Sequence, residues 1–219
     1  MNQFLKLFPH LARGKTLVRA LMDERLSRVM LSGTVLDVGG GKEAYLEFMP
    51  KEKLRGAQVI NIDGKTRMPD GRVCDLEVDP LPREDGTVDQ VLLLNVLEHV
   101  YDHRHVLSEI YRVLQSEGAL VGFVPFLVQY HPDPHDYFRY TKEALARLLR
   151  EQHFIDIEII EVGGGPFFVN YNTLVLSVPR AIALILFPWY YILDRVFLAL
   201  RPAARERYPL GYFFSATKG

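Results

Sequence analysis

Residues 131–141, HPDPHDYFRYT, bring together side chains of the kinds that move protons and hold substrates. Histidine exchanges a proton near neutral pH, so it suits a general base that removes a proton from a substrate hydroxyl. We expect His135 to take this role, and the further candidates are His131, Asp136 and His99. Tyr137 and Arg139 are expected to position the acceptor, Arg139 through a bidentate hold on a carboxylate or phosphate.

Two other interpretations of this segment are open. His131 and His135 are four residues apart, the spacing at which two side chains on one helix face bind a metal, but Pro132 and Pro134 prevent a helix here. We therefore expect no metal site. The second interpretation is purely structural: the prolines stiffen a loop whose aromatic residues pack over the helix that follows.

A run of three glycines, Gly39 to Gly41, follows the apolar residues VLDV and predicts a tight turn where a ligand approaches the backbone. A helix expected from about Glu43 would point its partly positive N-terminus at the same place. Asp63 ends the next apolar run, 22 residues beyond Gly41, where a carboxylate can hold both hydroxyls of a ribose. Together these features favour a nucleoside-containing cofactor.

The elements that position these residues alternate between strands and helices. We expect strands at 33–41, 57–63, 72–78, the start of 87–100, 119–126, 155–162 and 210–218, and helices at 15–30, 105–118 and 141–154. The helix at 105–118 should end at Gly118, and Thr141 should cap the last helix. This order predicts an α/β domain with a mostly parallel sheet, in which ligands bind at the carboxyl ends of the strands.

With these motifs the sequence resembles the class I S-adenosylmethionine-dependent methyltransferases of the small-molecule, methyltransferase-11-like type. The resemblance spans about residues 33–162 and rests on VLDVGGG, VINID, CDLEVDPLPREDGTVDQVLLLNVLEHV and EIYRVLQSEGALVGFVPF, together with the final strand LGYFFSATK. It implies a Rossmann-like, doubly wound, seven-stranded sheet with the last strand antiparallel. It also implies S-adenosylmethionine as the cofactor.

The resemblance further implies roles for individual residues. The methionine part of the cofactor would be cradled by Asp37, Gly39, Gly40 and Gly41. Asp63 would bind the ribose hydroxyls, and Asp75 would accept a hydrogen bond from the adenine amino group beside the backbone of Leu76. Asn95 and the VLEH segment would line the sulfonium side. One position departs from the pattern: Glu43 stands where a further glycine is usual. This difference affects the expected shape of the glycine loop more than its expected role.

Two alternative functions remain at this point. Gly39, Gly41 and Ala44 also fit G-x-G-x-x-A, and Asp63 has the spacing of a dinucleotide-binding fold, so an NAD(P)-dependent oxidoreductase is one alternative. The sequence shows no serine–tyrosine–lysine set for hydride transfer, which favours the methyltransferase. A non-catalytic cofactor-binding scaffold is the other, and the polar segment 131–141 argues against it.

A hydrophobic insert at about 166–207 separates the last two strands, where the resembled family has a short hairpin. Its charge-free run, 181–193, contains Pro188 and, at 13 residues, is too short to span a bilayer. Flanking charges and the cluster Trp189, Tyr190 and Tyr191 are typical of a membrane interface. We expect residues 174–202 and the N-terminal helix to contact a membrane peripherally, and the alternatives are a lid over the domain or a homodimer interface.

Charge divides the chain into residues 1–30, 31–162 and 163–219, with net charges of +4, −9 and +4. The basic ends suit an anionic membrane, whereas the acidic middle would repel nucleic acid, so we expect no nucleic-acid partner. We assign 1–30 to an N-terminal amphipathic helical segment and 31–219 to the methyltransferase domain. The single cysteine, Cys74, excludes an internal disulfide and fits a reducing compartment. With no secretory signal in view, we expect a cytoplasmic enzyme, peripheral on the inner face of the membrane, with a small-molecule or lipid-linked, glycan-type acceptor.

Overall fold

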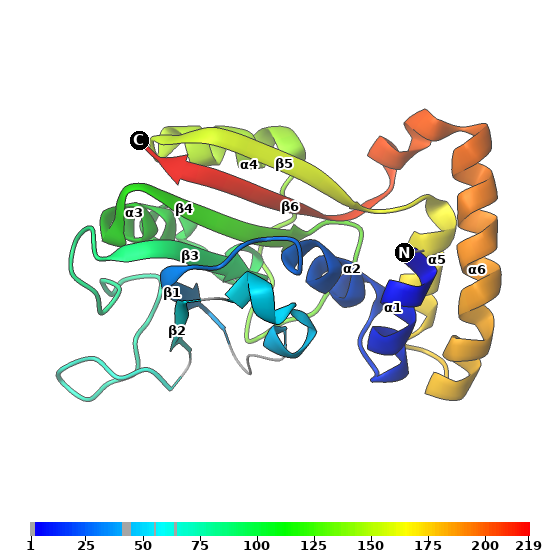
Figure 1. Cartoon of the computed structure of the whole chain (residues 1–219), viewed down its shortest axis with the longest axis horizontal. Coiled ribbons are helices and arrows are strands. Elements are labelled where there is room, and N and C mark those ends of the chain that lie inside the picture. Colours follow the sequence, from blue (N-terminus) through cyan, green and yellow to red (C-terminus); the bar gives the residue numbers. More distant parts are fainter. Residues whose placement is uncertain (1–2, 41–44, 55, 64) are drawn as a thin grey trace.

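The computed structural model describes residues 3–40, 45–54, 56–63 and 65–219, which form an α/β fold around a six-stranded sheet (Figure 1). The sheet order is β2-β1-β3-β4-β6-β5. The strands are β1 (Gly33–Val38), β2 (Ala57–Ile62), β3 (Val88–Leu94), β4 (Leu114–Pro125), β5 (Phe154–Gly163) and β6 (Pro209–Lys218). The first four run parallel, and β6 lies antiparallel between β4 and β5. The expected Rossmann-like sheet with an antiparallel last strand is confirmed, with six strands in the described residues instead of seven.

The missing strand is the one expected at 72–78, where the described residues form turns and one isolated bridge between Arg67 and Val73. The carboxylate of Asp79 explains the bend. It accepts a hydrogen bond from the backbone N–H of Asp75 at 2.8 Å and forms a bidentate pair with the guanidinium of Arg72 at 2.5 Å. These contacts fold the segment onto itself, so its backbone is not free to pair with the sheet.

The helix before β4, α3 (His103–Val113), ends earlier than the expected stop at Gly118. Strand pairing takes over at Leu114, which pairs with Val88 of β3. Glu117, at φ +62°, and Gly118 then lie at an irregularity where the register between β3 and β4 shifts. The next helix, α4 (Lys142–Glu151), is capped as predicted: the Thr141 side chain accepts from the N–H of Ala144 at 3.2 Å.

The N-terminal segment forms two helices, α1 (Gln3–Ala12) and α2 (Leu17–Leu26), in place of one helix over 15–30. Gly14, at φ +86°, allows the sharp turn between them, and Thr16 caps α2. The helix expected from about Glu43 would begin outside the described residues. From Tyr45 onward the chain forms two short 3-10 helices, η1 (Leu46–Phe48) and η2 (Lys51–Leu54).

Apolar side chains pack on both faces of the sheet, as a mostly parallel sheet requires. On one face, α3 and α4 contribute Ile110 and Leu149 to a cluster that includes Leu36 of β1. On the other face, the N-terminal helices and α5 (Pro166–Leu174) pack together with Leu92 of β3. Helices on both faces make the sheet doubly wound, and the carboxyl ends of its parallel strands remain uncovered by this packing.

The insert between β5 and β6 consists of α5, the long helix α6 (Arg180–Leu200) and the 3-10 helix η4 (Pro202–Arg207). Figure 1 shows α6 at the outer edge of the molecule, with α1 and α5 between it and the sheet. Asp194 of α6 is buried and accepts hydrogen bonds from the N–H groups of Gly165 and Phe168, at 2.9 and 3.0 Å, so it caps α5. Burial raises the pKa of Asp194.

Helix α6 continues through Pro188 over 21 residues, so it is longer than the 13-residue charge-free run on which we judged it too short to span a bilayer. By length and composition alone, α6 is the one described helix that is long and apolar enough to cross a membrane. Its inner face carries Phe187, whose ring stacks on that of Phe4 in α1 at 5.3 Å.

Candidate active site

A cavity of about 1150 Å³ lies at the carboxyl ends of the parallel strands, where this sheet topology predicts a ligand site. All the described residues that the sequence assigned to the cofactor line it: Asp37, Gly39, Gly40, Asp63, Asp75, Leu76 and Asn95. The remaining one, Gly41, lies outside the described residues. The four rim residues His99, His131, His135 and Tyr137 line the same cavity. The fold therefore brings the two groups of candidates to one place.

The glycine turn after β1 is shaped by close backbone approach. Gly39, at φ +74°, donates its N–H to the carbonyl of Ile62 at 2.7 Å, which ties the ends of β1 and β2 together. A Cβ atom at Gly40 would overlap the carboxylate of Asp37 and the side-chain amide of Asn61. Asp37 is buried and accepts a hydrogen bond from the Tyr45 hydroxyl at 2.7 Å. The turn thus has no room for a side chain.

Two further acids are fixed by turns of their own. Oδ1 of Asp63 accepts from the N–H of Lys65 at 2.9 Å and from the Thr66 hydroxyl at 3.3 Å. Oδ1 of Asp75 accepts from the N–H of Glu77 at 3.0 Å. Within the described part of the chain, the Oδ2 atom of each carboxylate makes no hydrogen bond, so each can accept one from a ligand hydroxyl or amino group.

Asn95 turns the chain after β3. It has φ +56°, a left-handed conformation that asparagine tolerates better than most residues, and its N–H donates to the carbonyl of Phe123 at 3.0 Å. The 3-10 helix η3 (Leu97–His99) follows at once. This turn places Glu98 and His99 beside the loop that follows β4.

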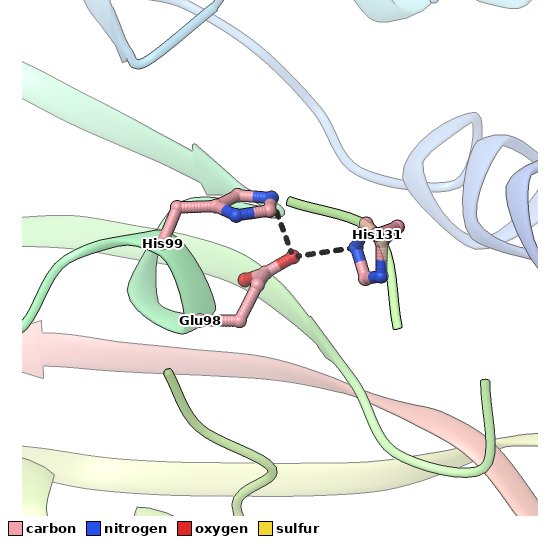
Figure 2. Close-up of side chains that lie close together, drawn as sticks. All are labelled: Glu98, His99 and His131. Atoms are coloured by element: carbon pink, nitrogen blue, oxygen red, sulfur yellow. Dashed lines mark ion pairs between the residues drawn. The ribbon is translucent and has the colours of Figure 1, made fainter. Parts of the chain in front are cut away.

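Figure 2 shows that Glu98 and His99 of η3 converge with His131 of the loop after β4. Nε2 of His99 lies 3.7 Å from Oε1 of Glu98, and Nε2 of His131 lies 3.8 Å from the same atom. Glu98 is fully buried. The Glu98 carboxylate raises the pKa of His131, and burial of the imidazole opposes this rise only in part. Both histidines were predicted as site residues, and Glu98 was included only as part of the VLEH segment, with no prediction that it would lie beside the two histidines.

His135 lies farther out on the same loop. Its side chain is exposed and lines the cavity, and its ring centroid is 5.2 Å from that of Tyr137. Its backbone carbonyl accepts from Nδ1 of His99 at 2.5 Å. As expected from Pro132 and Pro134, the segment forms no helix.

Asp136 and Arg139 are the two candidates that do not line the cavity. They form a bidentate ion pair with each other, and Oδ2 of Asp136 also accepts from the backbone N–H of His131 at 2.9 Å. Arg139 lowers the pKa of Asp136 to about 2. The guanidinium that we expected to hold an acceptor anion therefore braces the loop, and Asp136 fixes the backbone of His131.

Helix α2 also borders the cavity, which the sequence pattern does not predict, through its N-cap Thr16 and through Val18, Arg19 and Met22. Arg19 is the only lysine or arginine among the described lining residues, and its side chain is partly exposed. No local signal reveals this placement, because α2 reaches the cavity through its packing on β5, β6 and α5.

The residues present fit S-adenosylmethionine. The cradle at Gly40 lets a ligand approach the backbone beside a buried acid, and two further acids with accepting oxygens lie along the same cavity. Its volume exceeds the usual range for small-ligand pockets, about 300–1,000 Å³, so it has room for a cofactor and an acceptor together.

Comparisons with known proteins agree with this fit. The family model described as a methyltransferase domain matches residues 36–122. A probable S-adenosylmethionine-dependent methyltransferase of Mycobacterium tuberculosis is 27% identical over 108 residues, which cover 47% of this chain and 39% of that protein. This chain therefore matches well under half the length of that curated relative.

Solved structures share the fold. A SAM-dependent methyltransferase from Archaeoglobus fulgidus matches with a TM-score of 0.58 and 20% identity, over 99% of this chain and 100% of that one. A phosphoethanolamine N-methyltransferase of Haemonchus contortus, solved with phosphomonomethylethanolamine and S-adenosylhomocysteine, matches with a TM-score of 0.52 and 18% identity, over 92% of this chain and 52% of that one. These findings give the oxidoreductase alternative no support. Residues 36–122 therefore match a methyltransferase domain, within a fold that S-adenosylmethionine-dependent methyltransferases share, and S-adenosylmethionine is the cofactor that the lining residues fit.

Proposed function

We propose that this chain transfers the methyl group of S-adenosylmethionine to a small-molecule or lipid-linked acceptor at a membrane surface. The observation that carries the proposal is that the cofactor residues and the histidine rim line one cavity. The Haemonchus contortus neighbour, solved with a small phosphorylated amine, supports an acceptor of modest size.

When bound, the cofactor supplies an electrophilic methyl group on a sulfonium. The protein contributes position, a sheltered cavity and a base. In this arrangement Asp63 and Asp75 hold the nucleoside, and the turn at Gly39 and Gly40 admits the rest of the cofactor. His135 is exposed within the cavity and accepts the proton of an acceptor hydroxyl.

The proposal of a membrane surface rests on α6. Its outer face carries a row of exposed apolar side chains at helical spacing: Ile182, Ile185, Trp189, Ile192, Leu193, Val196 and Leu200. Exposed arginines accompany the row at Arg180, Arg195 and Arg201. Apolar residues beside arginines suit the headgroup layer of an anionic bilayer.

The way in which α6 packs on the domain favours a helix that lies on the bilayer over one that crosses the bilayer or forms a lid over the cavity. Its inner face is attached to the domain through Phe187 and the buried carboxylate of Asp194, so only the outer face is available to lipid. Among the described residues that line the cavity, none comes from α5 or α6, which argues against a lid. A second copy of the chain remains the competing occupant of this face.

Methyl transfer is tested with the full chain, S-adenosylmethionine labelled in its methyl group, and cell extract from a strain that lacks the protein. After reaction the extract is divided into organic and aqueous phases. Label in a discrete compound, lost with Asp63→Ala and with His135→Ala, is expected. Label in the organic phase identifies a lipid-linked acceptor, and label in the aqueous phase a soluble one. No transfer to either phase by a protein that binds the cofactor would contradict the enzymatic function.

Membrane contact is tested by cosedimentation with vesicles of phosphatidylcholine and phosphatidylglycerol. We expect binding that weakens at high salt without disappearing, and that falls strongly in Trp189→Glu. Ile155→Glu is the matched control, since Ile155 is an exposed apolar residue of β5, away from α6. If Trp189→Glu instead converts a dimer to a monomer and no vesicle binding occurs, α6 is a dimer interface.

A further inference from the structure

Three side chains at the acceptor end of the cavity, those of Glu98, His99 and His131, point toward one another (Figure 2). One ligand atom from each lies within 4.8 Å of the other two. We propose that these three residues bind one divalent transition-metal ion, of which Zn²⁺ is the probe. The site is not apparent from the sequence, because a helix, a strand and a loop separate its two histidines. The pair with the sequence spacing of a metal site, His131 and His135, is not the pair that the fold brings together.

The separations of the three atoms fit ligands that share an ion. The Nε2 atoms of His99 and His131 lie 3.7 and 3.8 Å from Oε1 of Glu98, which is too far for a hydrogen bond. Bonds of about 2.0–2.2 Å from zinc to nitrogen or oxygen place neighbouring ligand atoms roughly 3–4 Å apart. The two separations from histidine to carboxylate fall in this range, and the third separation is at most 4.8 Å, so the three atoms lie close enough to share one ion.

The opposite nitrogen of each imidazole has a backbone partner. Nδ1 of His99 lies 2.5 Å from the carbonyl oxygen of His135, and Nδ1 of His131 lies 3.0 Å from that of Gln129. The carbonyl beside His99 only accepts, so Nδ1 of His99 donates and its lone pair is at Nε2, which faces Glu98. At His131 the shorter contact, to the carbonyl of Gln129, favours the same tautomer over the longer contact of 3.3 Å between Nδ1 and the Arg139 guanidinium, which would need Nδ1 to accept. Metal-binding histidines commonly show this arrangement.

The carboxylate supplies an independent argument. Glu98 is fully buried, and neither of its oxygens has a hydrogen-bond partner among the described residues. A buried carboxylate without donors is costly, and an ion held between Glu98 and the two rings would satisfy it. A protonated His131 would balance the charge, but at 3.8 Å it makes no hydrogen bond to the carboxylate.

The supporting loops hold the ligands in place without an ion. Glu98 and His99 follow β3, and His131 follows the neighbouring strand β4. The loops are joined by a hydrogen bond of 2.7 Å from the N–H of Tyr137 to the carbonyl of Glu98. Three protein ligands leave a coordination position open, and both histidines line the cavity, so the position faces the acceptor.

The role of the ion deepens the proposed function and rests on it. An acceptor hydroxyl bound at the open position has a lowered pKa. Its O–H proton passes to His135. A lone pair of the resulting oxygen forms the bond to the methyl carbon, and the electron pair of the broken carbon–sulfur bond stays on sulfur. The metal then selects oxygen acceptors and orients them, and His135 remains the base.

The experiment uses tag-free full-length protein stripped of metal, titrated calorimetrically with Zn²⁺, with Co²⁺ absorption as a second reading. We expect one ion per chain. Glu98→Gln and His131→Ala should each weaken binding by at least about 10–100-fold, the loss that even outer-shell changes cause. His135→Ala is the matched control: it removes a histidine of the same loop, keeps the carbonyl that fixes His99, and should bind Zn²⁺ as the wild type does.

Binding of S-adenosylhomocysteine by each variant serves as the check on folding, and His131→Gln replaces His131→Ala if the latter fails it. Absence of saturable Zn²⁺ binding by the wild type, or equal binding by all variants, overturns the site. Failure of the proposed function looks different, because metal binding would then persist in a protein that transfers no methyl group. If Glu98→Gln loses the ion but keeps full turnover, the activating role is overturned.

Discussion

Asp136 provides a quantitative test of how the histidine-bearing loop is held. Its side chain is about 1% exposed, and it accepts hydrogen bonds from the Arg139 guanidinium and from the backbone N–H of His131. Replacing it in Asp136→Asn keeps the shape and removes the charge. Asp133→Asn is the control, since Asp133 is an exposed aspartate of the same loop whose carboxylate has no hydrogen-bond partner in the described part of the chain.

The magnitude follows from the pKa. Arg139 lowers the pKa of Asp136 from 3.8 to about 2 in the folded protein, and each unit corresponds to about 1.4 kcal/mol. Because the folded pKa is below the unfolded value, the stabilisation is fully present above the unfolded pKa and is lost as pH falls through the folded one. The ionised carboxylate thus contributes about 2 kcal/mol at neutral pH, about half of that near pH 3, and almost nothing below about pH 2.

Urea unfolding of wild type, Asp136→Asn and Asp133→Asn at neutral pH and near pH 3 measures this contribution. At neutral pH, Asp136→Asn should lower the free energy of unfolding by about 2 kcal/mol, while Asp133→Asn stays close to wild type. The gap should shrink by about half near pH 3. Equal stability of the two variants at neutral pH, or a gap that does not narrow with acid, would show that the ion pair does not hold this loop.

Three other changes probe separate parts of the molecule. Asp63→Ala should weaken binding of S-adenosylhomocysteine by about 1–3 kcal/mol in calorimetry, because ribose hydroxyls lose a partner; unchanged affinity would remove Asp63 from the site. Gly40→Ala places a Cβ against the carboxylate of Asp37, so cofactor binding should fall below detection while thermal unfolding shifts only modestly; normal binding would show that the turn is not a cradle. Asp194→Ala strands the N–H groups of Gly165 and Phe168 and should cost about 2–3 kcal/mol of stability in urea, with cofactor affinity retained in the folded protein; a neutral effect would mean that water replaces the cap.

The features that the sequence predicted correctly are those set by neighbouring residues. Three such features are the apolar run that leads into the glycine turn, the second run that ends at Asp63, and the cap at Thr141, and each depends on a few adjacent positions. Parallel strands then bring their carboxyl ends together, so the cofactor residues of the first two strands share a cavity.

The features that sequence analysis missed depend on contacts between distant residues. The strand expected at 72–78 is lost to contacts that Asp79 makes with the segment itself. In the sequence Glu98 is one acidic residue of the VLEH motif, and only the fold brings His131 next to it. Helix α2 lies at the cavity because of its tertiary packing. Amphipathic periodicity predicts a helix, but it does not predict where in the fold that helix packs.

The place of β6 in the sheet has a consequence for biosynthesis. In the described sheet, β5 pairs with β6 alone, and β6 comes after the insert in the chain. As the ribosome makes the protein, α6 emerges before the strand that joins β5 to the rest of the sheet. The apolar helix is thus exposed while the domain is still open at one edge. Whatever covers the outer face of α6 can therefore meet that face before the last strand completes the sheet.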